Sequence, residues 1–465
     1  MPKIRNNITN VKKLQRLKLA DNGPGHFRFN SFFAGIGGFD LGFERAGISP
    51  AFHCEINDFC QSVLRRHWPN LPTSSDIKDV NVDNLPDAEV WCGGFPCQDV
   101  SVARGGQGRD GLKGKNSGLF YPFLSLIKQK RPQVVVLENV TGLLNSHRGQ
   151  DFITIISSLT ELGYGVAWRV MNARYFGAPQ SRARVFICAW KNRIDLAVHA
   201  LYEREGSSQA KNERGGFVTP AKCRITGASV PLVSYCLAAT SGRHTGTDWS
   251  RTYVSYFDKV RRLTPVECEG MQGFPSGWSL PEKHYPLCDD EIDTLRYHAI
   301  GNAVCVSVVK WIGDRIAAGL SGEVSGFDVG MLFSSVLHKK ISEEYKDFHK
   351  STIKKLWDLK HSPGDREHVI RWKNGGAAYG EWCLEASTAT APNNPVEKKL
   401  IDVIEKREVE EKYFISPNAA KGILRRIASQ GRTLFKPLHE ALERLSKKNQ
   451  DEDCILEFRS KRART

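Results

Sequence analysis

The sequence predicts an α/β fold with a mostly parallel sheet that is covered by helices on both faces. Strand-like and helix-like runs alternate from Arg28 to about Trp190, as in folds that build a parallel sheet. The run 133–137 (QVVVL) is apolar and β-branched throughout, which is typical of a strand buried on both sides. The run 57–67 has apolar residues at helical spacing behind Asn57, a residue type that favours a helix N-cap. These observations predict a Rossmann-like domain.

Taken in order, the elements of this domain follow from local patterns of apolar residues. We expect strands at 28–33, 51–55, 89–92, 133–137, 165–171 and 184–189. We expect helices at 38–46, 57–67, 119–130 and 152–162, and a longer core helix in the apolar run 303–320.

The length of 465 residues predicts two or three domains. Residues 191–260 interrupt the alternation with a Gly-, Ser-, Thr- and Arg-rich stretch that suggests a small insertion. Beyond the core helix, an α-rich accessory segment is expected to follow a linker. The predicted units are a basic N-terminal arm (1–27), the α/β domain (28–190 and 261–320), the insertion (191–260), the linker (321–330), and the accessory segment with its basic tail (331–465).

The composition excludes several classes of protein. A chain that is 40% hydrophobic, 10% aromatic and 25% charged has the composition of a globular protein, not of a disordered one. No run of 18 apolar residues predicts a membrane span, and the basic N-terminus lacks the apolar stretch of a secretion signal. The twelve cysteines include no C-x-x-C pair, so we expect neither a zinc module nor a disulfide scaffold. A reducing cytoplasm fits best.

The charge is basic and unevenly distributed. Lysine and arginine total 66 against 51 acids, a formal charge of +15. Residues 1–28 carry seven basic side chains and one acid, residues 191–262 carry twelve and six, and residues 459–464 add four more basic side chains. This balance suggests a polyanionic partner, most simply nucleic acid. Charge alone leaves open a protein that is merely basic and soluble.

A glycine-rich turn, Phe33–Phe39 (FAGIGGF), connects the first predicted strand to the first helix. Its G-x-G-G spacing lets the backbone approach a ligand, although the turn alone could equally be an ordinary glycine turn. Glu55 follows 20 residues after Gly35, at the end of the second strand, where a carboxylate can bind ribose hydroxyls. Asp76 lies where the third strand end could meet an adenine. A nucleoside cofactor without a pyrophosphate, such as S-adenosylmethionine, fits this pattern better than NAD.

A cysteine follows the third complete strand in the run Gly93–Gln98 (GGFPCQ). Active sites of parallel sheets lie at this end of the strands, and Pro96 fixes the backbone before Cys97. A single cysteine is usually a small buried hydrophobe, but the glycine and proline context favours a functional thiol. The glycine-rich basic loop 101–116 that follows could be a plain surface loop or a lid.

Two further strands carry polar residues at the same edge. Glu138 follows the apolar strand 133–137, where limited solvation is expected to raise its pKa. An ordinary solvated acid is the alternative. In the run 180–184 (QSRAR), alternation places Arg182 and Arg184 on one face of a strand, where they could meet a base carbonyl and a phosphate.

These four motifs in this order resemble the C5-cytosine-specific DNA methyltransferases. The similarity extends to the late runs 261–265 (RRLTP), 272–275 (QGFP) and 298–304 (HAIGNAV), and covers about 28–320. The resemblance implies an S-adenosylmethionine-dependent methyltransferase domain in which residues 191–260 recognise the target. It implies Cys97 as nucleophile, with Glu138, Arg182 and Arg184 contacting the target cytosine. The implied S-adenosylmethionine-binding residues are Phe33, Gly35, Gly37, Gly38, Glu55, Asp76 and Asn302.

Three positions depart from the family pattern. Ser31 stands where many members have an aspartate, Ile56 replaces an aromatic residue that often stacks on adenine, and Gly270 replaces an arginine. The first two are expected to weaken cofactor binding, and the third to loosen packing against the recognition region.

The resemblance implies a cytoplasmic enzyme that acts as a monomer on double-stranded DNA without a metal. A tRNA cytosine-5 methyltransferase and a catalytically silent DNA-binding protein remain as alternatives. An NAD-dependent oxidoreductase is suggested by the glycine turn alone. For residues 331–465, a DNA-contacting role and a packing or partner role are both open, and no nuclease constellation stands out.

Overall fold

The structure is a computed structural model that describes residues 26–96, 117–207, 215–241, 250–324, 334–360 and 370–448. Within these residues, ten strands form the central sheet in the order β12-β14-β13-β6-β7-β5-β4-β1-β2-β3. Their bounds are β1 (Arg28–Phe32), β2 (Ser49–Cys54), β3 (Thr73–Ser74), β4 (Val90–Gly93), β5 (Val134–Val140), β6 (Tyr164–Asn172), β7 (Ala183–Lys191), β12 (Thr352–Lys355), β13 (Gly375–Tyr379) and β14 (Trp382–Ala386).

The strand directions confirm the predicted α/β sheet. Strands β1 to β5 pair in parallel. Strand β7 is antiparallel to both β5 and β6, so β6 runs in the same direction as β5. The carboxyl ends of β1, β2, β4 and β5 therefore meet at one edge, where open α/β sheets bind their ligands.

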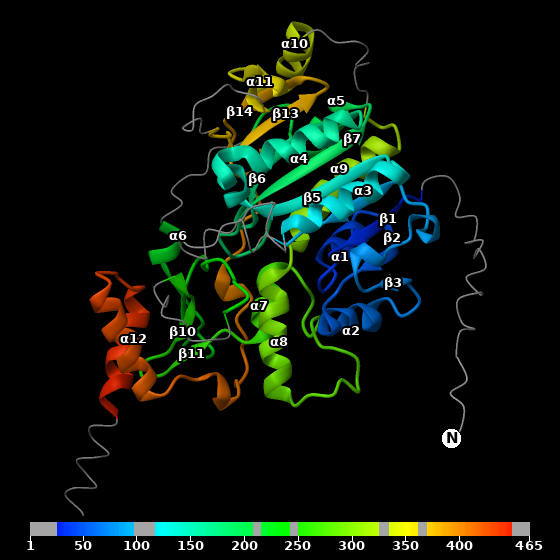
Figure 1. Ribbon diagram of the computed structural model, residues 1–465. Helices are drawn as coiled ribbons and strands as arrows, with labels where there is room; N and C mark the ends of the chain where they lie inside the picture. The colour runs from blue at the N-terminus through cyan, green and yellow to red at the C-terminus, as the bar shows by residue number, and fades with distance from the viewer. Residues whose placement is uncertain are drawn as a thin grey trace, which may run out of the picture.

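Helices cover both faces of this sheet, as predicted (Figure 1). Helices α3 and α4 bury their apolar side chains in the cluster on one face, and α1, α5 and α9 contribute to the cluster on the other. The bounds are α1 (Gly38–Glu44), α2 (Asp58–His67), α3 (Phe120–Lys130), α4 (Gln150–Glu161), α5 (Ile194–Leu201) and α9 (Val306–Leu320). Asn57 caps α2 as predicted, with its side chain accepting a hydrogen bond from the Cys60 N–H.

A second, smaller sheet lies beside the first and is antiparallel, in the order β11-β10-β9-β8. Its strands are β8 (Pro220–Lys222), β9 (Ser229–Pro231), β10 (Tyr253–Ser255) and β11 (Val260–Arg262), and its neighbours include α6 (Gly215–Val218), α7 (Pro265–Gln272) and α8 (Asp289–Asn302). Arg261 of β11 makes two 2.8 Å hydrogen bonds to Glu267 of α7, and both side chains are fully buried. This ion pair fixes α7 to the sheet. We call residues 215–241 and 250–262 the recognition region, because they overlap the segment 191–260 that is expected to recognise the target.

The structure corrects two predicted boundaries. Residues 194–201, predicted to belong to the insertion, form α5, whose apolar side chains pack into the core beside β6, β7 and α9. The predicted helix 303–320 begins only at Val306, because α8 ends at Asn302 and residues 303–305 link the two helices.

The accessory segment 331–465 also needs correction, because it is not only α-rich. Besides α10 (Ser334–Glu344), α11 (Leu356–Lys360) and α12 (Pro417–Ser429), it supplies β12, β13 and β14, which extend the central sheet beyond β6. Strand β13 begins with two glycines that do not look strand-like in the sequence. A Cβ on Gly376 would lie 2.2 Å from the Trp168 ring, so glycine lets β13 pack against β6.

From β14 the chain runs back across the molecule to the smaller sheet. The Val396 N–H donates to the Tyr175 carbonyl beside the central sheet. Further along, the Leu400 N–H donates to the Leu232 carbonyl and the Ile415 N–H to the Val260 carbonyl. Helix α12 and a second helix at 436–448 then pack against β10 and β11 (Figure 1). The segment therefore connects the two sheets.

Candidate active site

The glycine-rich turn lies directly after β1 and has the backbone that its sequence predicts. Phe33, Gly35 and Gly37 all have positive φ angles of 55°, 56° and 81°. A Cβ on Gly35 would meet nothing within 4 Å, so the turn borders open space there. A Cβ on Gly38 would lie 2.8 Å from the Val304 carbonyl oxygen. Gly35 and Gly37 thus allow the left-handed backbone of the turn, and Gly38 allows the start of α1 to pack closely against Val304.

Glu55 lies beside this turn and is held by it. The Gly35 N–H donates to one carboxylate oxygen at 2.7 Å, and the Asn57 N–H donates to the other at 2.8 Å. Burial raises the pKa of Glu55, and these backbone hydrogen bonds partly oppose the rise. Each oxygen keeps further lone pairs, so the carboxylate can still accept hydrogen bonds from two vicinal hydroxyl groups.

Two other predicted cofactor residues, Asp76 and Asn302, lie at the ends of elements of the fold, and Ile56 lies next to Glu55. Asp76 follows β3, the neighbour of β2, and caps a short helical turn by accepting from the Lys78 N–H at 3.0 Å. Ile56, next to Glu55, is 66% exposed and offers an apolar surface. Asn302 is the exposed last residue of α8 and precedes the segment whose Val304 packs on Gly38.

Below the turn, a buried carboxylate lies next to Ser31, the first of the three positions that depart from the family pattern. Ser31 of β1 donates to Asp40 of α1 at 3.0 Å, and His53 of β2 lies 2.9 Å from the second Asp40 oxygen. All three side chains are fully buried. Although position 31 carries no carboxylate, α1 supplies one between the first two strands.

Glu138 and Arg184 form the polar centre of the site. Glu138 lies within β5, which extends to Val140 and is therefore longer than predicted, and its carboxylate is 3.2 Å from the Arg184 Nε of β7. Burial raises the pKa of Glu138, although Arg184 and Arg182 act in the opposite direction. A Cβ on Gly94 would lie 3.4 Å from the Glu138 Oε2, so the chain after β4 passes directly beside the carboxyl group.

Asn139 holds that passing chain in place. Its side-chain amide donates to the Phe95 carbonyl at 3.1 Å, two residues before Cys97. Sequence patterns alone assign no role to Asn139, although it stands next to Glu138. Cys97 itself, the predicted nucleophile, and the predicted lid 101–116 lie outside the described residues.

Arg182 is 3% exposed, and its guanidinium joins three segments. It donates to the carbonyls of Leu237, Gly301 and Ala303 at 2.9, 3.1 and 2.8 Å. In this structure Arg182 thus ties the recognition region to the end of α8, while Arg184 is the arginine that reaches Glu138. Both guanidiniums lie near the Cys236 Sγ, at 3.4 and 3.8 Å, so the two arginines do share a face.

Cys236 is a second residue that sequence reasoning missed, because its neighbours are distant in the chain. Burial raises the pKa of this thiol, but Arg182 and Arg184 outweigh that effect and the net pKa is lowered. Cys236 is nevertheless exposed to solvent. A thiol whose pKa is lowered by these two arginines therefore lies beside Arg184, the partner of Glu138.

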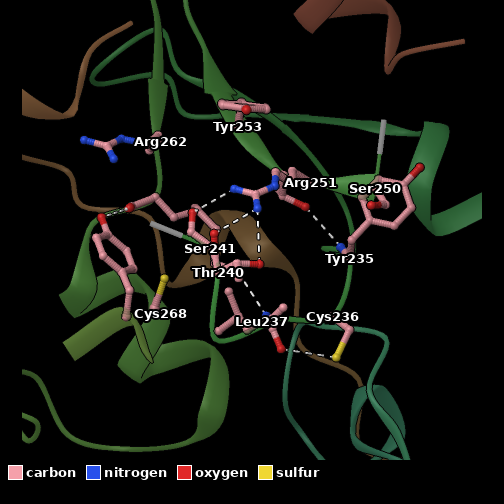
Figure 2. Close-up of a pocket in the computed structure, with 14 residues that line it drawn as sticks. Tyr235, Cys236, Leu237, Thr240, Ser241, Ser250, Arg251, Tyr253, Arg262 and Cys268 are labelled. Carbon is pink, nitrogen blue, oxygen red and sulfur yellow. Dashed lines mark hydrogen bonds between the residues drawn. The ribbon is translucent and has the colours of Figure 1, made fainter. Parts of the chain in front are cut away.

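A pocket of the recognition region begins at Cys236 (Figure 2). Arg251 closes one side by donating to the Thr240 and Ser241 carbonyls at 2.8 and 3.3 Å. The pocket lining is more polar than apolar and includes a second arginine, Arg262. This arrangement suits an anionic or hydrogen-bonding ligand. The lining residues are Tyr235, Cys236, Leu237, Ala238, Thr240, Ser241, Ser250, Arg251, Thr252, Tyr253, Arg262, Leu263, Cys268 and Tyr297.

Gly270 is the third position that departs from the family pattern, and the C-terminal segment fills the space beside it. A Cβ at this position would lie 3.4 Å from Val403, which is ordinary contact, so Val403 occupies the space next to α7. The expected loosening at Gly270 is thus offset by a residue outside the region of resemblance.

Neither metals nor membranes are indicated by the part of the chain that the structure describes. No group of three or more histidine, cysteine, aspartate or glutamate side chains there could hold a metal ion. No helix among those residues is both long and apolar enough to cross a membrane.

Comparisons with known proteins agree with the motifs. A family model described as C-5 cytosine-specific DNA methylase matches residues 27–217 and 207–318, more than half of the chain. The Type II methyltransferase M2.BsuMI of Bacillus subtilis (strain 168) is 31% identical over 312 residues, covering 64% of this chain and 77% of that protein. The Type II methyltransferase M.Bsp6I of Bacillus sp. (strain RFL6) is 29% identical over 317 residues, covering 62% and 97%. The solved structure of Entamoeba histolytica methyltransferase EhMeth aligns with 63% of this chain at a TM-score of 0.48 and 15% identity.

Proposed function

Since this chain belongs to the C-5 cytosine-specific DNA methylase family, and is thus a DNA cytosine methyltransferase, we propose how it works. It transfers a methyl group from S-adenosylmethionine to C5 of a flipped-out cytosine in a specific duplex sequence, through a covalent adduct with Cys97. The observation that carries this proposal is the Glu138–Arg184 pair, with a carboxyl of raised pKa beside the chain that leads to Cys97. The Type II names of the relatives support a role as the modification enzyme of a restriction-modification system.

The residues around the glycine turn fit the proposed cofactor. The Glu55 carboxylate would bind the ribose hydroxyls, the exposed Ile56 would pack on the adenine, and Asp76 would bind an adenine edge. The open space at Gly35 leaves room for the ligand close to the backbone. When bound, S-adenosylmethionine supplies an electrophilic methyl group. The absence of the pyrophosphate-binding third glycine disfavours NAD.

The protein's own side chains must make cytosine C5 nucleophilic. We propose that the Cys97 thiolate adds to C6 while protonated Glu138 donates to N3, so that electron density moves to C5. A raised pKa suits Glu138 to this task because it keeps more of the carboxyl group protonated near neutral pH. After methylation, a base removes the C5 proton and the C6–sulfur bond breaks. Arg184 holds the Glu138 carboxyl group in place.

The base must leave the duplex before it can reach these residues. Flipping costs roughly a few kcal/mol of lost stacking and pairing, which contacts with the phosphates and neighbouring bases must offset. We propose that the recognition region supplies them, with Arg251 and Arg262 at its pocket and Arg182 linking it to the active site. The protein would act on DNA as a monomer in the cytoplasm.

A direct assay tests this proposal. DNA from a host expressing the chain should acquire 5-methylcytosine at one sequence by bisulfite sequencing, and a host expressing Cys97→Ser should not. Purified protein should methylate a duplex with that sequence and leave tRNA unmodified. Transfer to tRNA alone would favour the RNA-modifying alternative, and binding without transfer would favour the silent DNA-binding protein.

A further inference from the structure

The end of the described chain forms a helical hairpin, residues 413–448, made of α12 and the helix 436–448. It lies outside the region that the family model matches, which ends at residue 318. The alignment with M.Bsp6I uses 62% of this chain and already covers 97% of that protein. The hairpin is thus an addition that the family fold does not require.

This hairpin is fixed to the recognition region. The Ile415 N–H donates to the Val260 carbonyl at 3.0 Å, and Phe414 bridges Arg261 of β11. Its apolar residues share one cluster with Tyr253 and Val260, namely Ile415, Ala420, Ile423, Ile427, Leu438, Ala441, Leu442 and Leu445.

The turn between β10 and β11 makes further contacts with the hairpin. Arg444 donates to the Phe257 carbonyl at 3.1 Å and lies over the Phe257 ring, and Lys448 pairs with Asp258 at 2.5 Å. The hairpin and β10–β11 therefore behave as one packed unit.

The hairpin is predominantly basic. Residues 413–448 contain eight basic side chains and two acids, Glu440 and Glu443, both of which lie on the second helix, whereas α12 has three basic side chains and no acid. On α12 the exposed residues Asn418, Lys421 and Arg425 lie at helical spacing opposite the buried Ala420, Ile423 and Ile427. A solvated helix face normally mixes both signs. An acid-free basic face instead favours a polyanion.

The hairpin lies next to the surface that is proposed to read the target. Tyr253 both lines the pocket with Arg251 and Arg262 and belongs to the apolar cluster under α12. Arg262 also donates to the Lys412 carbonyl at 3.1 Å, next to the start of the hairpin. Helix α12 spans thirteen residues, or about 20 Å, so its basic face can follow several phosphates of one strand.

We propose that the hairpin 413–448 binds the phosphate backbone of the DNA duplex outside the target sequence, through Lys421 and Arg425 of α12. The proposal rests on the proposed function, because the target must be seated on the recognition region. The hairpin would then add sequence-independent affinity on one side of the target.

The test compares wild type with Lys421→Gln/Arg425→Gln on a duplex that extends well beyond both sides of the target. The matched control is Lys346→Gln/Lys350→Gln, two exposed lysines near the far end of the central sheet. The hairpin variant should bind several-fold more weakly at low salt. Its slope of log affinity against log salt should be shallower by about 0.9 for each lost phosphate contact, while the control keeps the wild-type slope.

Trimming the duplex separates the possible causes. Removing flanking DNA on one side of the target should abolish the difference between wild type and hairpin variant, and trimming the other side should leave it. Equal slopes on the long duplex would overturn the proposal, as would a difference that survives trimming on both sides. Wild-type methylation of the trimmed duplexes reports on the proposed function separately, so the two failures are distinguishable.

Discussion

Opposing influences act on the carboxyl group of Glu138: burial raises its pKa, while the charges of Arg184 and Arg182 lower it. The proposed mechanism needs the protonated form. Activity should therefore fall as pH rises through the raised pKa, since the proton donor is lost there. The same arginines also lower the pKa of Cys236, so one pair of charges acts on two titrating groups.

The first prediction removes one of these charges. In Arg184→Gln, the pKa of Glu138 loses its largest lowering influence and should rise further. The alkaline limb of single-turnover methyl transfer should then move to higher pH, even if the rate falls. Arg65→Gln, a change at an exposed arginine of α2, should leave the limb in place. A limb that stays or moves to lower pH in Arg184→Gln would refute the assigned role of Glu138.

The second prediction concerns the cofactor. In the wild type, each Glu55 oxygen accepts from one backbone N–H and can also accept from one ribose hydroxyl. Glu55→Gln replaces one of these oxygens by an NH2 group, which cannot accept either hydrogen bond. Binding of S-adenosylmethionine should weaken by about 1.5–3 kcal/mol, the range for hydrogen bonds to charged groups. Calorimetry measures this, with Asp58→Asn on the exposed start of α2 as control. Equal affinity in Glu55→Gln and wild type would remove Glu55 from the cofactor site.

At the scale of elements, the contact between α1 and α9 positions the glycine turn. These helices approach closely because α1 has no side chain at Gly42, where a Cβ would lie 2.5 Å from the Val309 Cβ. Interiors are too tightly packed to absorb such an overlap without movement. The turn before α1 would move with the helix.

The third prediction compares two glycines in helices. Gly42→Ala should lower the free energy of unfolding by about 1–3 kcal/mol, as overpacking does. In Gly422→Ala of α12, the new Cβ would meet only the guanidinium end of the flexible Arg426 side chain, with Nη1 nearest at 3.2 Å. This change should be neutral or stabilising by up to about 1 kcal/mol. Urea denaturation measures both. If Gly42→Ala proved as stable as Gly422→Ala, the close packing of α1 on α9 would be wrong.

At the scale of the whole molecule, the sequence predicted what local patterns encode. The cap at Asn57, the β-branched run of β5 and the spacing of Glu55 from the glycine turn each depend on a few neighbouring residues, and each was found as expected. Strand β13 escaped prediction because its glycines are explained only by the Trp168 ring of a distant strand. The Arg182–Cys236 contact escaped for the same reason, since 54 residues separate the pair.

The C-terminal segment shows the same limit on a larger scale. Its composition suggested a separate accessory unit, but β12 to β14 complete the catalytic sheet and the hairpin supports the recognition region. Val403 even occupies the space beside Gly270, a departure that looked like a defect in the sequence alone. Such compensation depends on which distant segments the fold brings together.

The covalent adduct at Cys97 is the central claim, and 5-fluorocytosine tests it most directly. Fluorine at C5 cannot leave as a proton, so a duplex with 5-fluorocytosine at the target should trap the enzyme. The adduct should survive denaturing electrophoresis, should become irreversible only with S-adenosylmethionine, and should map to Cys97 by mass spectrometry. Cys97→Ser should bind DNA without forming it. An adduct at another cysteine, such as Cys236, or full methylation by Cys97→Ser would contradict the account.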